Sequence, residues 1–154
     1  YKSLCFLGLW SSLTVRINLM EEAVLSDEQC LFCNIPQELI IAENSFAYAI
    51  KDEFPVTEGH TLVIPKNHVD EYFGLSIEEL LGCDNLLKAI RRDLLLIDDT
   101  IKGFNIGMNS GAAAGQTILH CHIHLIPRRE GDVDDPRGGV RNVIPGKGLY
   151  SQHT

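Results

Sequence analysis

The sequence predicts a single α+β domain in which an antiparallel sheet packs against one long helix. Short apolar, β-rich runs bounded by turn residues occur before residue 66 and after residue 103, and a long run with helical spacing lies between them. Strands grouped in hairpins around one helix are typical of α+β folds. A length of 154 residues with 45% hydrophobic content suits one domain with a full core.

The first strands are predicted as a hairpin. The runs ELIIA at 38–42 and FAYAIKD at 46–52 flank the turn residues Asn44 and Ser45. A third strand is predicted over 60–64, and we expect Pro65 to end it because proline has no N–H for the ladder.

The helix is predicted over 77–98. Ser76 followed by Glu79 is a capping-box pattern, and apolar residues then recur every three or four positions. Two more strands are predicted over 104–108 and 118–126, on either side of the loop NSGAAAGQT.

Histidine occupies every second position at His120, His122 and His124, with apolar residues between. On an extended strand the three imidazoles would project from one face at intervals of roughly 6.5 Å. Histidine titrates nearest neutral pH and can serve as nucleophile, proton donor or metal ligand. A single histidine on a strand is usually structural, but three on one face beside a glycine-containing loop indicate a chemical site.

The stretch AGQTILHCHIHLIPRR resembles the signature of the histidine triad (HIT) family of nucleotide hydrolases and transferases. The segments EGHTLVIPKNH at 58–68 and CLFC at 30–33 resemble other blocks of that family, so the likeness covers about residues 28–130. The resemblance implies a five-stranded antiparallel sheet with a long helix packed on it, and a homodimer.

Three parts of the chain are expected on this basis: an N-terminal extension or leader over 1–25, a HIT domain over 26–130 and a C-terminal tail over 131–154, where glycine, proline and charge replace periodicity.

The resemblance also implies catalytic roles. His122 is then the nucleophile that attacks the α-phosphorus to give a nucleotidyl-histidine, and His124 assists the leaving group. Gln116 and Thr117 would donate hydrogen bonds to the phosphate, and Asn109 would contact the phosphate or the leaving group. The alternative for Thr117 is an ordinary strand residue, and small residues in the loop also make ordinary turns.

The remaining substrate contacts are expected near the second strand. Asp52 would accept hydrogen bonds from the ribose hydroxyls, and His60 would support the triad. Three apolar residues would form a slot around the base: Phe32, Ile50 and Phe54. From the residues alone, the alternative for Asp52 is a solvated carboxylate in a turn, and the alternative for His60 is a buried structural histidine. The alternative for the three apolar residues is that they are core side chains.

Cys30 and Cys33 have the two-residue gap of metal or redox sites, and structural zinc takes four ligands. In HIT proteins that carry this element, the resemblance implies that His68 and His120 complete a structural zinc site; free thiols are the alternative. The other cysteines, Cys5, Cys83 and Cys121, are interpreted as small apolar fillers.

The formal charge of −8 gives no electrostatic basis for nonspecific binding to nucleic acid or to an anionic membrane. The expected partner is a small nucleotide, held by a local pocket of donors. Cysteine usage favours a reducing compartment, so we expect a cytoplasmic protein, and the apolar run near residue 1 is too short to span a membrane.

The expected activity is hydrolysis of dinucleoside polyphosphates such as diadenosine polyphosphates, because IPRREGDV resembles that branch of the family. Asn109 resembles the phosphoramidase branch instead, so nucleoside phosphoramidase and nucleotidyltransferase remain alternatives. A nucleotide-binding sensor or adaptor without turnover is the rival from another class. A cupin-like metal site is rejected because Glu130 follows His124 at too long a spacing.

Overall fold

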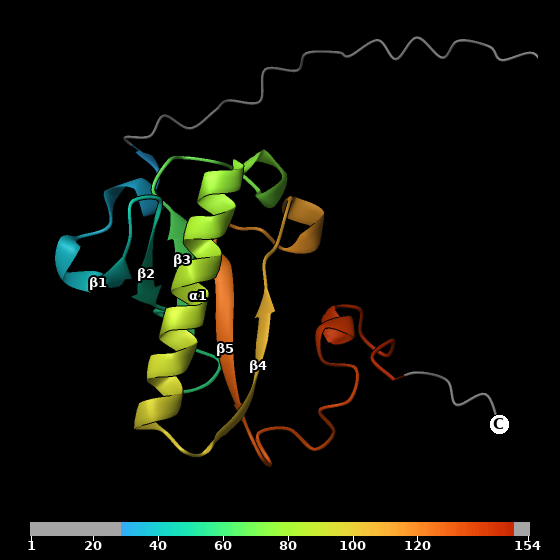
Figure 1. Cartoon of the computed structure of the whole chain (residues 1–154). Coiled ribbons are helices and arrows are strands. Elements are labelled where there is room, and N and C mark those ends of the chain that lie inside the picture. Colours follow the sequence, from blue (N-terminus) through green and yellow to red (C-terminus); the bar gives the residue numbers. More distant parts are fainter. Residues whose placement is uncertain (1–28, 150–154) are drawn as a thin grey trace, which may run out of the picture.

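The computed structural model describes residues 29–149, and it confirms the predicted α+β class (Figure 1). The five strands form one antiparallel sheet in the order β1-β2-β3-β5-β4. Their bounds are Ile40–Glu43 for β1, Ala47–Lys51 for β2, Thr61–Pro65 for β3, Ile101–Gly107 for β4 and Ile123–Arg129 for β5. Predictions for residues 1–25, including Cys5, lie outside the described residues.

The helix α1 spans Ile77–Ile97 and crosses one face of the sheet (Figure 1). Its predicted capping box is present: Ser76 Oγ accepts a hydrogen bond from the Glu79 backbone N–H at 3.2 Å, and a Glu79 carboxylate oxygen accepts one from the Ser76 N–H at 2.8 Å. The helix ends one residue before the predicted position. No helix within 29–149 is long and apolar enough to cross a membrane.

The β1–β2 hairpin is closed by Asn44, as the turn residues predict. The side-chain oxygen of Asn44 accepts hydrogen bonds at 2.9 Å from the N–H groups of Phe46 and Ala47. Its amide donates to the Gly82 carbonyl at 2.8 Å, which ties the turn to α1. The first strand begins at Ile40 because a 3₁₀ turn occupies Gln37–Leu39.

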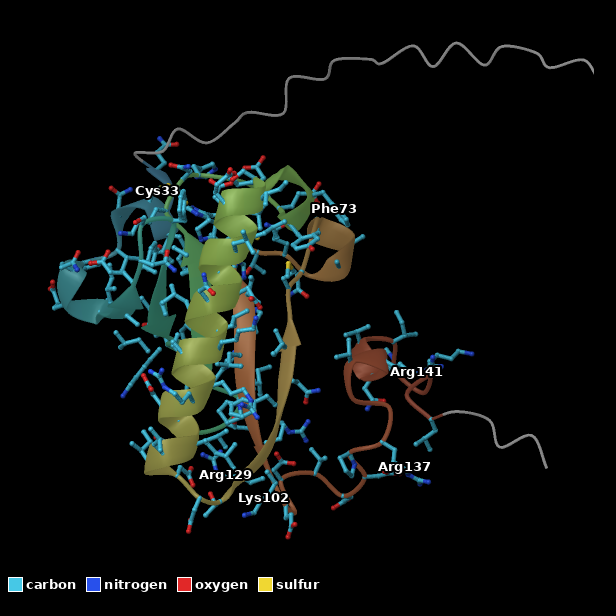
Figure 2. The ribbon with its side chains drawn as sticks, in the orientation of Figure 1. Cys33, Phe73, Lys102, Arg129, Arg137 and Arg141 are labelled. Atoms are coloured by element: carbon cyan, nitrogen blue, oxygen red, sulfur yellow. The ribbon has the colours of Figure 1, made fainter. Side chains whose placement is uncertain are left out.

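The two ends of the sheet carry different chemistry. Figure 2 shows Cys33 at one end of the molecule, beside the first turns of the described chain, and Arg129 at the opposite end. Beyond β5, the described part of the tail forms a 3₁₀ turn at Gly139–Val143 that lies beside β4.

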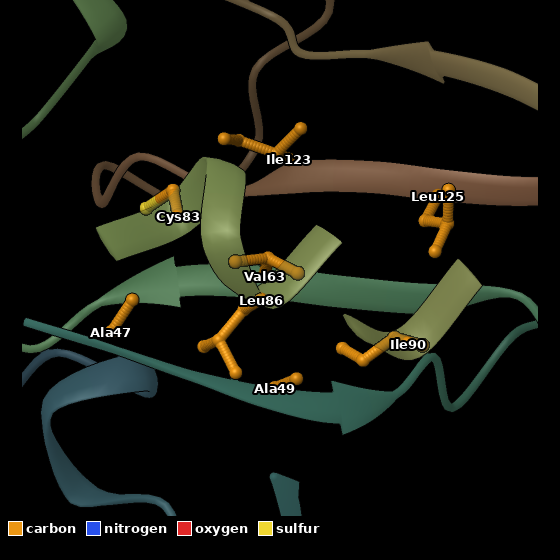
Figure 3. Close-up of a cluster of buried hydrophobic side chains, with 8 residues drawn as sticks. All are labelled: Ala47, Ala49, Val63, Cys83, Leu86, Ile90, Ile123 and Leu125. Atoms are coloured by element: carbon orange, nitrogen blue, oxygen red, sulfur yellow. The ribbon is translucent and has the colours of Figure 1, made fainter. Parts of the chain in front are cut away.

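One core fills the space between α1 and the sheet (Figure 3). Three helix side chains at helical spacing, Cys83, Leu86 and Ile90, meet small and branched side chains from the strands. The strand members of this core are Ala47, Ala49, Val63, Ile123 and Leu125. Because side chains alternate along a strand, the residues between them point to the opposite face of the sheet.

The opposite face carries a second apolar cluster and the candidate site. Its buried members are Cys30, Phe32, Tyr48, Ile50, Leu62 and Ile64. The central strands β2 and β3 are therefore covered on both faces, which explains their nearly continuous apolar sequences.

The predicted strand over 118–126 is wrong at its start, because β5 begins at Ile123. The backbone N–H of Cys121 bonds to the Val69 carbonyl at 2.6 Å, and that of His120 bonds to the Ile118 carbonyl at 2.9 Å, so this segment lies outside the ladder. His124 is in β5, whereas His120 and His122 precede it. The strand predicted over 104–108 starts three residues earlier, at Ile101, and β3 includes Pro65 as its last residue.

Candidate active site and metal centre

The side chain of His122 is buried and held by its own neighbour in the chain. Its Nδ1 lies 2.8 Å from the backbone oxygen of His120, and the residue is 7% exposed. Because a carbonyl oxygen can only accept, this bond assigns the proton to Nδ1. In the neutral ring, Nε2 then keeps the lone pair that a nucleophile needs.

Strand register brings the next side chains together on the same face. His124 pairs with Leu62, and Leu62 pairs with Ile50. His60 and Asp52 lie two residues from Leu62 and Ile50, so both share the face of His124. The backbone N–H of Asp52 also bonds to the His60 carbonyl at 3.0 Å, which closes the loop between them.

His60 and His124 form a hydrogen-bonded pair. The His60 Nε2 lies 3.0 Å from the His124 Nδ1, and the His60 Nδ1 accepts the Val56 N–H at 3.3 Å. This pattern places the His60 proton on Nε2, so the His124 Nδ1 accepts and the His124 proton is on Nε2. Asp52 Oδ2 is 3.4 Å from the His60 Nδ1 and 3.9 Å from the His124 Nδ1.

Burial keeps both rings of this pair neutral. It lowers the pKa of His60 from 6.5, against the opposing charge of Asp52. Burial is also the main cause that lowers the pKa of His124, followed by the like charges of His122 and His60, while Asp52 opposes them. At neutral pH the stable form is therefore the neutral pair in which the His60 Nε2–H donates to the His124 Nδ1; we call this pair the relay.

The loop before the triad is held by Gln116. Its side-chain oxygen accepts the Gly111 N–H at 2.7 Å, and its amide donates to the carbonyls of Asp70 at 2.5 Å and Ile118 at 3.1 Å. Gly111 and Gly115 have φ values of 83° and 90°, which favour glycine. The buried Gln116 thus shapes the loop, and its role as a phosphate donor stays a prediction.

Two other predicted contact residues lie on the same loop with exposed or partly exposed side chains. Thr117 is exposed, and the Asn109 amide donates weakly to the Gly115 carbonyl at 3.5 Å. Both belong to the segment that precedes the triad, and neither role is decided by these contacts.

The predicted base-slot residues occupy different environments. Phe32 and Ile50 are buried in the second apolar cluster, at 5% and 8% exposure, whereas Phe54 is 81% exposed on the loop after Asp52. The Phe32 ring packs edge-on against His122, with ring centroids 5.2 Å apart. Phe32 therefore touches the triad directly, and the base slot stays a prediction.

All four residues expected at the metal centre come together. Cys30, Cys33, His68 and His120 each offer a donor atom, and these atoms lie within 4.8 Å of one another. The Sγ atoms of Cys30 and Cys33 are 3.4 and 3.5 Å from the His120 Nδ1, and the Cys33 Sγ is 3.2 Å from the His68 Nδ1. Donors around tetrahedral zinc are about 3.5 Å apart, so this set fits the ion.

The far nitrogen of each metal-centre imidazole has an acceptor. The His120 Nε2 lies 2.9 Å from the Pro65 carbonyl oxygen, and the His68 Nε2 lies 3.1 Å from a carboxylate oxygen of Asp70. Such acceptors hold the proton on Nε2 and turn the Nδ1 lone pair toward the ion. A second group of possible donors, Asp52, His60 and His124, lies equally close together, and the His60–His124 hydrogen bond accounts for that proximity.

Sequence reasoning missed two supporting residues of the metal centre. Asp70 follows His68 by two positions, a spacing that could have suggested it as an acceptor. The Tyr48 hydroxyl donates to the Phe32 carbonyl, a contact between distant residues that carries no sequence signal. Cys83 and Cys121 are buried, and burial raises their thiol pKa values to about 12 and about 11, in keeping with apolar fillers.

Comparison with known proteins gives consistent matches. The HIT domain model matches residues 34–131. A HIT-like protein of Mycoplasma genitalium is 42% identical, over 66% of this chain and 74% of that protein. The adenosine 5'-monophosphoramidase HNT1 of Saccharomyces cerevisiae is 34% identical, over 68% and 65%, and the adenylylsulfatase HINT3 of Arabidopsis thaliana is 35% identical, over 73% and 58%.

A solved structure agrees with these matches. The zinc-bound histidine triad protein of Mycobacterium smegmatis has a TM-score of 0.62 and 36% identity, over 69% of this chain and 79% of that one. With a family match over most of the domain and a shared fold, this chain belongs to the HIT family of histidine triad proteins, whose members include nucleotide hydrolases.

Proposed function

We propose that this protein hydrolyses nucleotides at the α-phosphate through a nucleotidyl-histidine formed on His122. The observation that carries the proposal is the 2.8 Å bond from the His122 Nδ1 to the His120 carbonyl, because it leaves the lone pair on Nε2. The hydrogen-bonded pair of His60 and His124 lies beside it, with ring centroids of His122 and His124 5.2 Å apart.

The reaction proceeds in two displacements. The His122 Nε2 attacks the α-phosphorus, a P–N bond forms, and the bond from phosphorus to the leaving group breaks while the His124 Nε2–H donates a hydrogen bond that stabilises the charge on that group. Water then attacks the same phosphorus, the P–N bond breaks with its electron pair returning to the His122 Nε2, and a proton of the water passes to solvent. The products are a nucleoside monophosphate and the leaving group, which for a phosphoramidate takes a proton from solvent.

The loop at residues 109–117 would stabilise the negative charge of the transition state. Backbone N–H groups near Gly111 and Gly115, with Asn109 and Thr117, would stabilise charge on the pentavalent phosphorus, and such preorganised donors contribute about 3 kcal/mol each. Gln116 holds this loop in shape. Asp52, which lies beside His60, would accept hydrogen bonds from the ribose hydroxyls.

The favoured substrates are adenylyl compounds with a small leaving group. Two relatives are named for such reactions, a monophosphoramidase and an adenylylsulfatase. The cue for diadenosine polyphosphates is the resemblance of the continuation IPRREGDV to that branch of the family. In the structure Arg128 pairs with Asp132 at 2.7 Å and Arg129 with Asp98 at 2.5 Å, so these cations are engaged in ion pairs. Because the two named relatives act on compounds with small leaving groups, diadenosine polyphosphates are our second candidate.

One experiment tests both candidates and the nucleophile. Purified protein and His122→Ala are incubated with adenosine 5'-phosphoramidate, adenosine 5'-phosphosulfate and diadenosine tetraphosphate, and release of AMP is followed. We expect turnover of the phosphoramidate by the wild type and none by the variant. An alkaline quench, which preserves the P–N bond, should reveal adenylylated His122 by mass spectrometry. Nucleotide binding without turnover of any substrate would favour the sensor or adaptor.

We also propose that the four-residue centre holds structural zinc. Cys30, Cys33, His68 and His120 would bind it, and the bound ion would supply folding energy by tying the N-terminal turn to the sheet. None of the displacement steps above passes through this centre. Metal analysis of purified protein, with Cys33→Ser as the matched variant, tests the assignment.

A homodimer remains part of the proposal. The strand β4 lies at the edge of the sheet, and several apolar side chains of α1 are exposed, including Ile77, Leu81, Leu96 and Ile97. Exposed apolar surface and an edge strand favour association. Light scattering coupled to size exclusion distinguishes one copy from two. The cytoplasmic location stays a prediction.

A further inference from the structure

Phe32 links the metal centre to the candidate nucleophile. It lies between Cys30 and Cys33 in the chain and is 5% exposed. Its ring meets two of the triad imidazoles edge-on: the centroid distance is 5.2 Å to His122, at an interplanar angle of 65°, and 6.0 Å to His120, at 78°. These are favourable geometries for aromatic pairs.

The backbone that carries this ring is fixed at two points. The Tyr48 hydroxyl, on β2, donates to the Phe32 carbonyl, and the Asn34 amide donates to the Cys30 carbonyl at 2.9 Å, which closes the turn. Tyr48 is 5% exposed and belongs to the same apolar cluster as Phe32. The backbone that carries the ring is therefore tied to β2, and the buried ring packs within the same cluster.

The second restraint on His122 comes from the same end of the molecule. Its Nδ1 proton goes to the His120 carbonyl, and the His120 ring is placed by both cysteine sulfurs and by the Pro65 carbonyl. A flip of the His122 ring would exchange Nδ1 for a carbon and lose that bond. An aromatic edge packed against the imidazole opposes such a rotation.

We propose that Phe32 is a positioning residue for the His122 imidazole. The turn at residues 30–34, which carries two of the candidate metal ligands and is called the metal-binding turn below, fixes the orientation of the nucleophile through this ring. The kinetic part of this inference rests on the proposed function. Phe32 touches no reacting atom in this scheme. It acts by keeping the Nε2 lone pair in one direction, and a displacement of a catalytic group by about 1 Å can cost about 100-fold in rate.

The test compares Phe32→Leu with Leu31→Ala, a matched control on the same turn whose side chain is 59% exposed. Nitrogen-15 spectra of labelled histidine, recorded at pH 8 and assigned with His122→Asn, report which ring nitrogen carries the proton. We expect one tautomer of His122 in the wild type and in Leu31→Ala, and an averaged pair in Phe32→Leu. With adenosine 5'-phosphoramidate, kcat of Phe32→Leu should fall about 10- to 100-fold with KM nearly unchanged.

Two results would overturn the inference. A raised KM with unchanged kcat would make Phe32 a wall of the base slot, and a lowered melting temperature with unchanged His122 signals would make its role purely structural. Tyr48→Phe, which removes only the hydroxyl tether, provides a second variant if Phe32→Leu does not fold, and it should shift the His122 signals in the same direction.

A separate experiment tests the link between the metal-binding turn and His122. Removal of metal from the wild type with a chelator should reproduce the Phe32→Leu spectrum of His122. Unchanged His122 signals in the metal-free protein would refute the link. Because these spectra need no turnover, they decide the positioning role even if no substrate is hydrolysed, so the two proposals fail separately.

Discussion

Replacing His60 with phenylalanine tests the relay that orients His124. The variant keeps a planar ring in a position that is 4% exposed, but it removes the donor 3.0 Å from the His124 Nδ1. A hydrogen bond of this kind contributes about 1 kcal/mol net, and leaving the partly buried acceptor of His124 unsatisfied costs at most about 3 kcal/mol. If this loss appears in the transition state, kcat falls about 5- to 150-fold, since about 1.4 kcal/mol corresponds to a factor of ten.

The assay is AMP release from adenosine 5'-phosphoramidate across a range of pH, with Glu53→Gln as a control because Glu53 is exposed on the same loop. His60 contributes one of the charges that lower the pKa of His124. Its loss should therefore raise the pKa of His124, which a titration of the His124 ring followed by NMR would report. A His60→Phe enzyme with wild-type kcat and an unchanged His124 pKa would refute the relay.

Stability to urea should be full above pH 6.5 and should fall progressively below it, because His60 and His124 have folded pKa values below 6.5 and the unfolded chain then binds more protons; equal melts at pH 7.5 and 5.5 would contradict this. Asp70→Ala should weaken zinc binding about tenfold in a chelator competition, because it removes the hydrogen-bond acceptor of the His68 Nε2. An unchanged zinc affinity would exclude this role for Asp70. Leu86→Ala, at 5% exposure, should cost about 2–5 kcal/mol of unfolding free energy, while Leu96→Ala, at 78% exposure, should cost little; similar losses in both would show that the core is elsewhere.

The sequence predicted those elements whose signals are local. The capping box of Ser76 and Glu79 and the apolar spacing after it gave α1 to within one residue at its end. The turn at Asn44 was predicted because its side chain can bond to backbone groups two and three positions away. Such contacts depend on neighbours in the chain, so a pattern of residue types is sufficient to recognise them.

The strand before the triad shows where local reasoning failed. Alternation of histidine with apolar residues predicted one strand over 118–126, yet the ladder starts at Ile123. The Cys121 N–H bonds to Val69, a residue far away in the sequence, and this tertiary contact takes the segment out of the sheet. Periodicity of two residues describes an extended chain, but it does not say which backbone groups will be paired.

By itself, the sequence determined that this chain carries a HIT-type signature, an α+β order of elements and four possible zinc ligands. Only the tertiary structure decided that Phe32 packs on His122, that His60 donates to His124 and that Gln116 holds the loop. These are contacts between side chains on separate elements, and their geometry depends on how the sheet registers and packs. Local propensity contains no information about that packing, which is why spacing revealed the chemistry and the fold revealed its arrangement.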